Sequence, residues 1–230
     1  MVTGMNILLI LSKIFNSNFS EEKIDEGGIT MLKAYNLAKY IITKCTLDNK
    51  AISNLQLQKI LYFIQGAFYF RFKHKAFDDT IEAWDYGPVI PDVYYSYNCY
   101  GSEPICKIYS NFTSLDSLIC NEETDAEDEI NVINLLIEKL REKNPWDLVK
   151  TSHEDNTPWS IIYKGYWREI NDELIKDYFI DDKYNVFNKL GINFDDKPKQ
   201  SDFSEETIKS LDILKKIDDI IKDSNSNETE

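Results

Sequence analysis

A helix that is apolar on nearly every side is the sequence feature that most constrains this fold. Residues 53–72 carry one stripe of apolar side chains at helical spacing, and further apolar and aromatic side chains widen it. A helix of this kind is buried among other elements. We therefore predict a central helix that begins after Ser53, where Ser53 and Gln56 form a capping box, and that ends near Phe72. The stripe is Leu57, Ile60, Leu61, Ile64 and Phe68, widened by Leu55, Tyr62, Phe63 and Tyr69.

Amphipathic segments predict further helices around the central one. Residues 31–46 and 126–143 each show apolar side chains at the 3.6-residue period. The chain has only 8 glycines and 6 prolines, which is low for a turn-rich all-β protein. Capping residues or prolines predict additional helical starts at Pro91, Thr157-Pro158 and Asn171 or Asp172. Asn144-Pro145 is expected to end the helix before it and to start a turn.

A short extended segment interrupts this helical pattern. Side chains alternate in character from Ile81 to Tyr86, and Gly87-Pro88 is expected to end the segment because both residues disfavour its continuation. The predicted fold is therefore mainly α: a compact multi-helix domain with a small β element, plus an appended C-terminal helix.

The chain divides into five predicted regions. Residues 1–30 are a leader or non-native extension, with Met31 as a candidate natural start, because the Glu-Gly-Gly codons before it can spell a ribosome-binding sequence. Residues 31–192 form the helical domain, 193–203 a charged linker, 204–222 an amphipathic helix and 223–230 a disordered tail. The last helix carries a stripe that must dock on its own domain or on a partner, formed by Ile208, Leu211, Leu214, Ile217 and Ile221.

The net charge of −14 comes mostly from two segments. Residues 121–129 hold six acidic groups and no basic one, and residues 195–230 hold eleven acidic and six basic groups. These segments favour solubility, and a chain so acidic has no general footprint for nucleic-acid phosphates. No apolar run reaches transmembrane length, so we expect no membrane partner.

The four cysteines form no Cys-x-x-Cys pair, which favours a reducing cytoplasm. A Cys3His zinc site that includes His74 or His153 stays open, although the ligand-like spacing is absent. We predict no metal and no cofactor. The four tryptophans, Trp84, Trp146, Trp159 and Trp167, are expected mainly in the core.

Sequence motifs for catalysis are absent. The chain has no phosphate-cradling glycine loop, no H-E-x-x-H and no G-x-S-x-G. An enzyme hypothesis would need His153 with an orienting carboxylate from Glu82, Asp85 or Glu154. The competing interpretation is that His153 hydrogen-bonds the loop before Thr157-Pro158 and fixes its path.

One combination of segments is far more specific than any single motif. Residues 57–66 (LQKILYFIQG) are followed by 81–94 (IEAWDYGPVIPDVY), and later by 151–154 (TSHE) and 157–159 (TPW). Across about residues 31–180 this pattern resembles the Panacea domain, also called the SocA-like antitoxin domain. Ser152 stands between the threonine and histidine positions of the family pattern.

The resemblance implies an antitoxin of a bacterial or phage toxin–antitoxin pair. Such a protein neutralises a cognate toxin by direct contact, and the toxin is expected from an adjacent gene. A small cytoplasmic hydrolase and a DNA-binding mobile-element regulator remain the alternatives, and a homo-oligomer stays open. The resemblance carries no catalytic constellation; it marks positions for folding or toxin binding, namely Gln58, Lys59, Tyr62, Gln65, Gly66, Glu82, Trp84, Gly87, Pro88, Tyr94, His153, Pro158 and Trp159.

Overall fold

The computed structural model describes residues 32–112, 115, 126–198, 209, 213 and 216. Helices dominate this part of the chain, and the strands form one small antiparallel sheet, which confirms the predicted fold class. In chain order the elements are α2 (Ala34–Leu47), α3 (Asn54–Phe72), β1 (Glu82–Trp84), β2 (Gly87–Val89), α4 (Pro91–Tyr97), the 3-10 helix η1 (Asn98–Tyr100), α5 (Ala126–Arg141), α6 (Pro145–Ser152), α7 (Pro158–Ile162), β3 (Arg168–Glu169), α8 (Asp172–Phe179) and α9 (Val186–Lys189).

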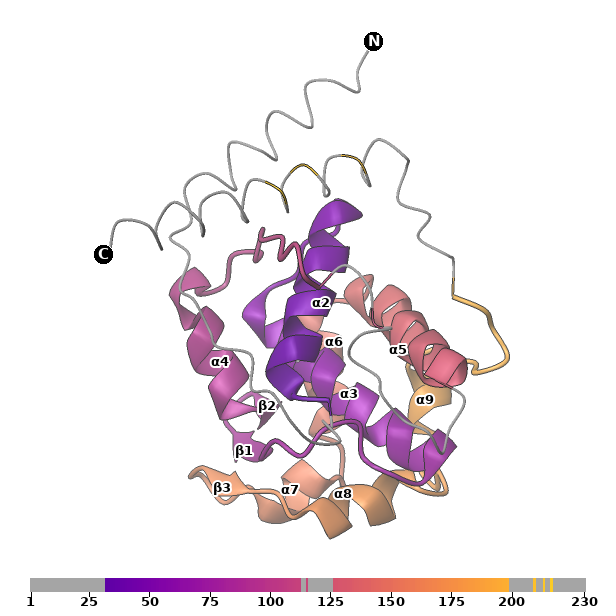
Figure 1. Cartoon of the computed structure of the whole chain (residues 1–230). Coiled ribbons are helices and arrows are strands. Elements are labelled where there is room, and N and C mark those ends of the chain that lie inside the picture. Colours follow the sequence, from indigo (N-terminus) through magenta and orange to yellow (C-terminus); the bar gives the residue numbers. More distant parts are fainter. Residues whose placement is uncertain are drawn as a thin grey trace, which may run out of the picture.

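The central helix is α3, as the sequence predicts. It contacts α2, α4, α5, α6, α8 and β2, and Figure 1 places it behind α2 and beside α5. Fifteen of its 19 residues are buried, including polar side chains as well as apolar ones. Burial on all sides explains why the apolar pattern of this helix is not confined to one face.

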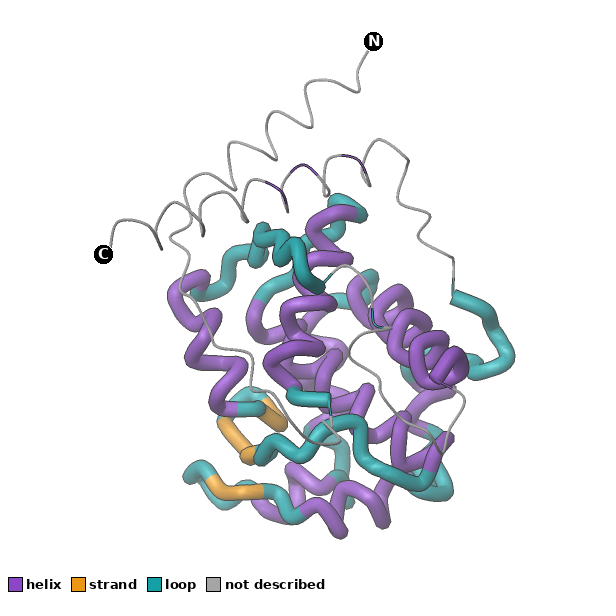
Figure 2. The backbone as a smooth tube through the Cα atoms, in the orientation of Figure 1, coloured by secondary structure: helices purple, strands orange, loops and turns teal. Residues whose placement is uncertain are grey.

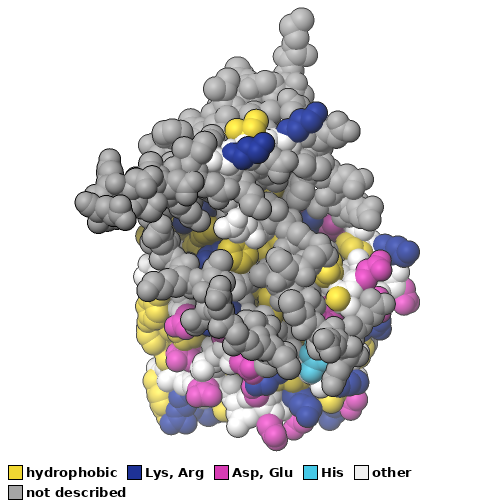
Figure 3. Space-filling view, in the orientation of Figure 1, with side chains coloured by type: hydrophobic (Ala, Val, Ile, Leu, Met, Phe, Trp, Pro, Cys, Tyr) yellow, Lys and Arg dark blue, Asp and Glu magenta, His cyan; other side chains and the backbone are white. Residues whose placement is uncertain are grey.

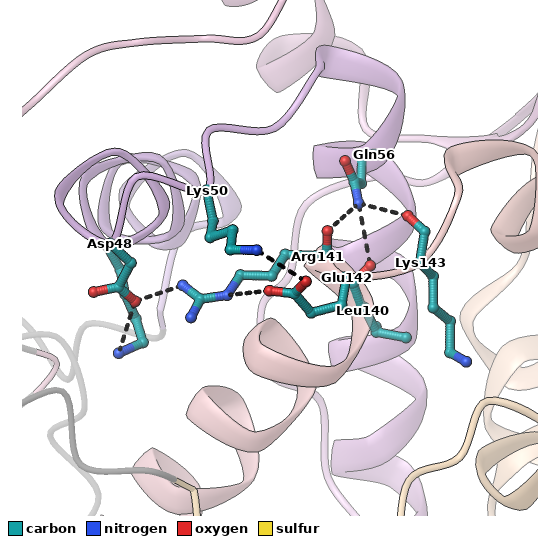
Figure 4. A network of polar contacts seen from close by, with 8 residues as sticks. Asp48, Lys50, Gln56, Leu140, Arg141, Glu142 and Lys143 are labelled. Carbon is teal, nitrogen blue, oxygen red and sulfur yellow. Dashed lines mark hydrogen bonds and ion pairs between the residues drawn. The ribbon is translucent and has the colours of Figure 1, made fainter.

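At the start of α3, only one of the two hydrogen bonds of the predicted capping box forms. Ser53 accepts a hydrogen bond from the Gln56 backbone N–H at 3.3 Å, so it caps the helix. The Gln56 side chain does not return to Ser53. Its Nε2 donates instead to the carbonyls of Leu140, Arg141 and Lys143 at 2.9–3.2 Å, where α5 ends (Figure 4). Gln56 therefore satisfies the last carbonyl groups of another helix.

Ion pairs join the ends of α2 and α5 next to the Gln56 side chain (Figure 4). Arg141 contacts Asp48, which follows α2, and Lys50 lies 3.3 Å from Glu142 (Figure 4). Arg141 is largely buried, whereas Lys50 and Glu142 are exposed. The Arg141 pair therefore contributes more to holding the two helices than the solvent-screened Lys50 pair.

The sheet has the strand order β2-β1-β3 and lies at one end of the helical body (Figure 2). The expectation that Gly87-Pro88 ends the extended segment is wrong, because these residues begin β2. Trp84 pairs with Gly87 across a two-residue turn, and Gly87 has φ +102, which favours glycine. The sequence pattern missed the partner strand because it has only three residues and no alternation.

Side-chain caps begin α6, α7 and α8, and the turn expected after Asn144 is a helix of eight residues. Asn144 accepts from the Trp146 N–H before α6, Thr157 from Ser160 before α7, and Asn171 from Glu173 before α8. Pro91 occupies the first turn of α4, where a missing N–H costs nothing.

Gly66 on α3 allows α8 to pack closely against it. A Cβ atom at this position would lie 2.7 Å from the Phe179 ring, closer than carbon atoms approach. Phe179 is itself fully buried and packs edge-on against Tyr62 at 5.6 Å.

We predict that Gly66→Ala lowers the free energy of unfolding by about 1–3 kcal/mol, because the added methyl group overpacks this contact. Urea denaturation monitored by circular dichroism measures the change. Phe179→Leu is the matched partner: combined with Gly66→Ala it should cost less than the sum of the two single variants. Additive costs would contradict this account of the α3–α8 contact.

Candidate functional site

The family-motif glutamines of α3 point into the molecule and bind backbone. Gln58 accepts a hydrogen bond from the Ile90 N–H at 2.8 Å, just before α4. Gln65 accepts from the N–H groups of Ala76 and Phe77, and donates to the Phe77 carbonyl at 3.0 Å. Both side chains are almost completely buried. Each amide therefore holds a neighbouring loop in place by satisfying backbone groups that water cannot reach.

Lys59 directly follows Gln58 on α3 and binds the hairpin formed by β1 and β2. Its Nζ donates to the Pro88 carbonyl at 2.8 Å, and the whole side chain is buried. Burial lowers the pKa of Lys59 to about 7, because removal from water disfavours the charged amine. Gly87, the residue before Pro88, must be glycine, since a Cβ atom there would lie 2.7 Å from Ser152 Oγ and 2.9 Å from Lys59 Nζ.

Ser152, which interrupts the family's threonine–histidine pair, is buried at the end of α6. Its Oγ donates to the Val149 carbonyl at 2.8 Å, and its own carbonyl accepts from Thr157 Oγ1 at 2.9 Å. Ser152 thus ties α6 to the cap of α7 while filling the space above Gly87.

His153 stacks face to face on Trp159, with 3.5 Å between the ring centroids. Its pKa is lowered to about 4 by burial and by the charge of Lys59, so the ring is neutral at pH 7. Among the residues that the structure describes, His153 Nε2 is buried without a hydrogen-bond partner, so this nitrogen does not make the expected bond to the loop before Thr157, and the ring is stacked on Trp159 instead.

The tryptophans of the motif extend this stack to the sheet. Trp159 Nε1 donates to the Trp84 carbonyl at 2.7 Å, and Trp84 Nε1 donates to Glu82 Oε2 at 2.7 Å. Tyr94 packs edge-on against Trp84 at 4.9 Å, and its carbonyl accepts from Asn54 of α3. These contacts connect α7, β1, α4 and α3.

The remaining motif positions are also used in packing. Pro158 is buried at the first position of α7, and Gly66 lies against Phe179. Tyr62 is buried among aromatic rings, and burial raises the pKa of its hydroxyl well above the ordinary value. The motif positions therefore converge on contacts between α3 and the elements around it.

The carboxylates of the hydrolase alternative are engaged away from His153. Glu82 accepts from Trp84, Asp85 accepts from the Tyr163 hydroxyl at 2.7 Å, and Glu154 pairs with Lys189 at 2.6 Å. Within the residues that the structure describes, none of the three bonds His153. In the described part of the chain, these three carboxylates therefore do not orient the His153 ring.

In the described part of the chain, neither His74 nor His153 lies in a set of side chains that could bind zinc. His74 lies 3.1 Å from Glu129, and His153 is stacked on Trp159. Cys45 is buried and Cys99 and Cys106 are exposed, and no group of three or more metal-ligating side chains occurs among the residues described. Among those same residues, no helix is long and apolar enough to span a bilayer.

The expectation that the tryptophans lie mainly in the core is wrong for two of them. Trp84 is 7% exposed, whereas Trp146 is 58% and Trp167 is 54% exposed. Tyr86, Tyr95 and Tyr166 are also more than half exposed. Trp167 and Tyr95 lie against Trp84 of β1, and Trp146 packs on Tyr86 in the turn between β1 and β2. Hydrophobic side chains reach the surface along the side where α4 and the strands lie (Figure 3). Residue type alone did not identify them, because a ring's exposure depends on which other elements cover it.

The predicted C-terminal contact stripe lies outside the described residues. That holds for Ile208, Leu211, Leu214, Ile217 and Ile221, and for regions 1–30 and 223–230. Its role stays a prediction.

Comparison with known proteins gives matches to one family over part of the chain. Residues 57–160 match the family model described as Antitoxin SocA-like, Panacea domain, so the predicted Panacea resemblance is confirmed over this segment. The chain is also 29% identical over 158 residues to a protein named Antitoxin SocA from Caulobacter vibrioides (strain NA1000 / CB15N). That alignment covers 65% of this chain and 84% of the relative. No solved structure matches the chain.

We predict that Lys59 makes stability rise with pH above neutrality. The pKa of Lys59 is about 7 in the folded chain and ordinarily 10.5, so between these values the unfolded state holds a proton that the folded state has lost. The free energy of unfolding therefore increases across this window, by at most about 1.4 kcal/mol per pH unit.

Lys59→Met removes this contribution, and urea denaturation at pH 7 and pH 9.5 measures it. The exposed Lys150→Met is the matched control and should keep the wild-type rise. If the Lys59→Met chain gained as much stability with pH as the wild type, Lys59 would not be the group that titrates.

Proposed function

We propose that this chain is an antitoxin that neutralises a cognate toxin by direct protein–protein binding. The observation that carries the proposal is the Panacea-domain match over residues 57–160, together with the relative named Antitoxin SocA. We further propose that the toxin is encoded by an adjacent gene and that both proteins act in the cytoplasm.

The contacts of the motif side chains support binding rather than catalysis. The polar groups of Gln58, Lys59 and Gln65 hydrogen-bond to the chain's own backbone inside the molecule. Among the described residues no carboxylate bonds the neutral, stacked His153, so the ring has no orienting partner there for general-base catalysis. A binding function would therefore use the outer surface, where exposed aromatic rings lie around the sheet. Such rings are frequent anchors of protein interfaces.

The acidic charge of the chain supports a protein partner over nucleic acid. The net charge is −14, and DNA binding relies on cationic side chains that neutralise phosphates. A toxin with a basic surface would instead be attracted to this chain at long range.

Co-expression with the adjacent gene tests the proposal. The neighbouring gene should arrest growth when expressed alone, and growth should recover when this chain is produced with it. The control is the same plasmid with a stop codon at Lys59, which removes the protein and keeps the transcript. Recovery with the stop codon, or a harmless neighbour that forms no complex with the chain, would contradict the proposed function.

A further inference from the structure

The outward side of the small sheet carries aromatic rings and carboxylates side by side. Glu82 is paired with Glu169 across β1 and β3, and the indoles of Trp84 and Trp167 stack at 4.1 Å with an interplanar angle of 9°. Alternate residues of a strand share a face, so these four side chains lie on one face and Ala83 lies on the other. Ala83 is entirely buried, which makes the opposite face the outer one.

We call this surface the outer sheet face and define it as Glu82, Trp84, Tyr95, Trp167 and Glu169. Tyr95 joins it from α4, with its ring 5.8 Å from that of Trp84. Trp167 and Tyr95 are 54% and 56% exposed, and Glu169 is exposed as well. Trp84 beneath them is nearly buried and is fixed through its hydrogen bond to Glu82. The exposed rings therefore rest on a rigid support.

The electrostatics of this face are unfavourable in the free chain. Glu82 and Glu169 stand directly opposite each other, and like charges in that position repel. Among the described residues, the ion pairs join other carboxylates and leave both of these without a cation. The nearby Arg168 occupies the alternate position of β3 and stacks over Tyr166 at 4.4 Å.

We propose that the outer sheet face is the toxin-binding surface and that its occupant is an arginine-bearing segment of the toxin. This inference rests on the proposed antitoxin function. A guanidinium group suits the face because it is planar, stacks on indole and donates hydrogen bonds to carboxylates in pairs. It would relieve the repulsion between Glu82 and Glu169 while covering the exposed face of Trp167.

Charge complementarity also distinguishes this occupant from two others. A second copy of the chain that used the same face would bring two more carboxylates to the contact, and phosphate groups would also meet two carboxylates. Both are repelled where a basic protein segment is attracted. The surface extends beyond the family match, because Trp167 and Glu169 follow residue 160. It can therefore differ between proteins that share the same scaffold.

Binding of the purified full chain to the purified adjacent-gene product, measured by calorimetry, tests the inference. Trp167→Ala should weaken binding at least tenfold, as loss of an interface tryptophan does. Glu169→Lys should weaken it similarly, and Glu169→Gln should reduce the salt dependence of the affinity. The matched control is Asp128→Lys, a charge reversal at an exposed carboxylate on α5, which should stay within threefold of the wild type.

Each outcome separates the two proposals. If the wild-type chain binds and the Trp167 and Glu169 variants bind equally well, the outer sheet face is not the contact, whereas the antitoxin function stands. If only Asp128→Lys weakens binding, the contact lies on α5. A wild-type chain that fails to bind the toxin contradicts the proposed function itself. Thermal melting shows whether Trp167→Ala still folds, and the exposed Glu169 variants keep the test valid if it does not.

Discussion

The fold depends on polar side chains buried along one helix. Asn54, Gln56, Gln58, Lys59 and Gln65 of α3 all hydrogen-bond to groups of the elements packed around them. An unsatisfied buried backbone group costs about 1–3 kcal/mol, so a loop that leaves its amide partner loses more than contact area. The short helices and strands of this chain have little stability alone, and α3 gives them a common set of partners.

The sequence predicted the elements whose signals are local. The period of apolar residues identified α3 and α5, and single capping residues such as Thr157 located helix starts. It missed β2, because Gly87 and Pro88 usually mark the end of a strand and here pair with β1. It also assigned Gln56 to its own helix, whereas the side chain binds the end of α5, more than 80 residues away. Such partners are set by tertiary packing, which no local pattern contains.

The same distinction applies to the candidate site. The motif positions were identified from the sequence, and the structure gives them partners inside the fold: Lys59 with Pro88, Trp159 with Trp84. The exposed rings of Trp146 and Trp167 were expected in the core. A shared interior with a separate outer face accounts for a family motif that carries no catalytic set. We propose that most motif positions build the scaffold, whereas Glu82 and Trp84 also belong to the outer sheet face that contacts the toxin.

Hydrogen–deuterium exchange of the chain, alone and with its toxin, tests this division most directly. The residues of α3 are already buried in the free chain, so their amide exchange should change little when the toxin binds. Peptides that contain β1, α4 and residues 164–170 should become protected when the toxin binds. Protection confined to residues 199–230, or to elements remote from the sheet, would contradict the claim that the outer sheet face makes the contact.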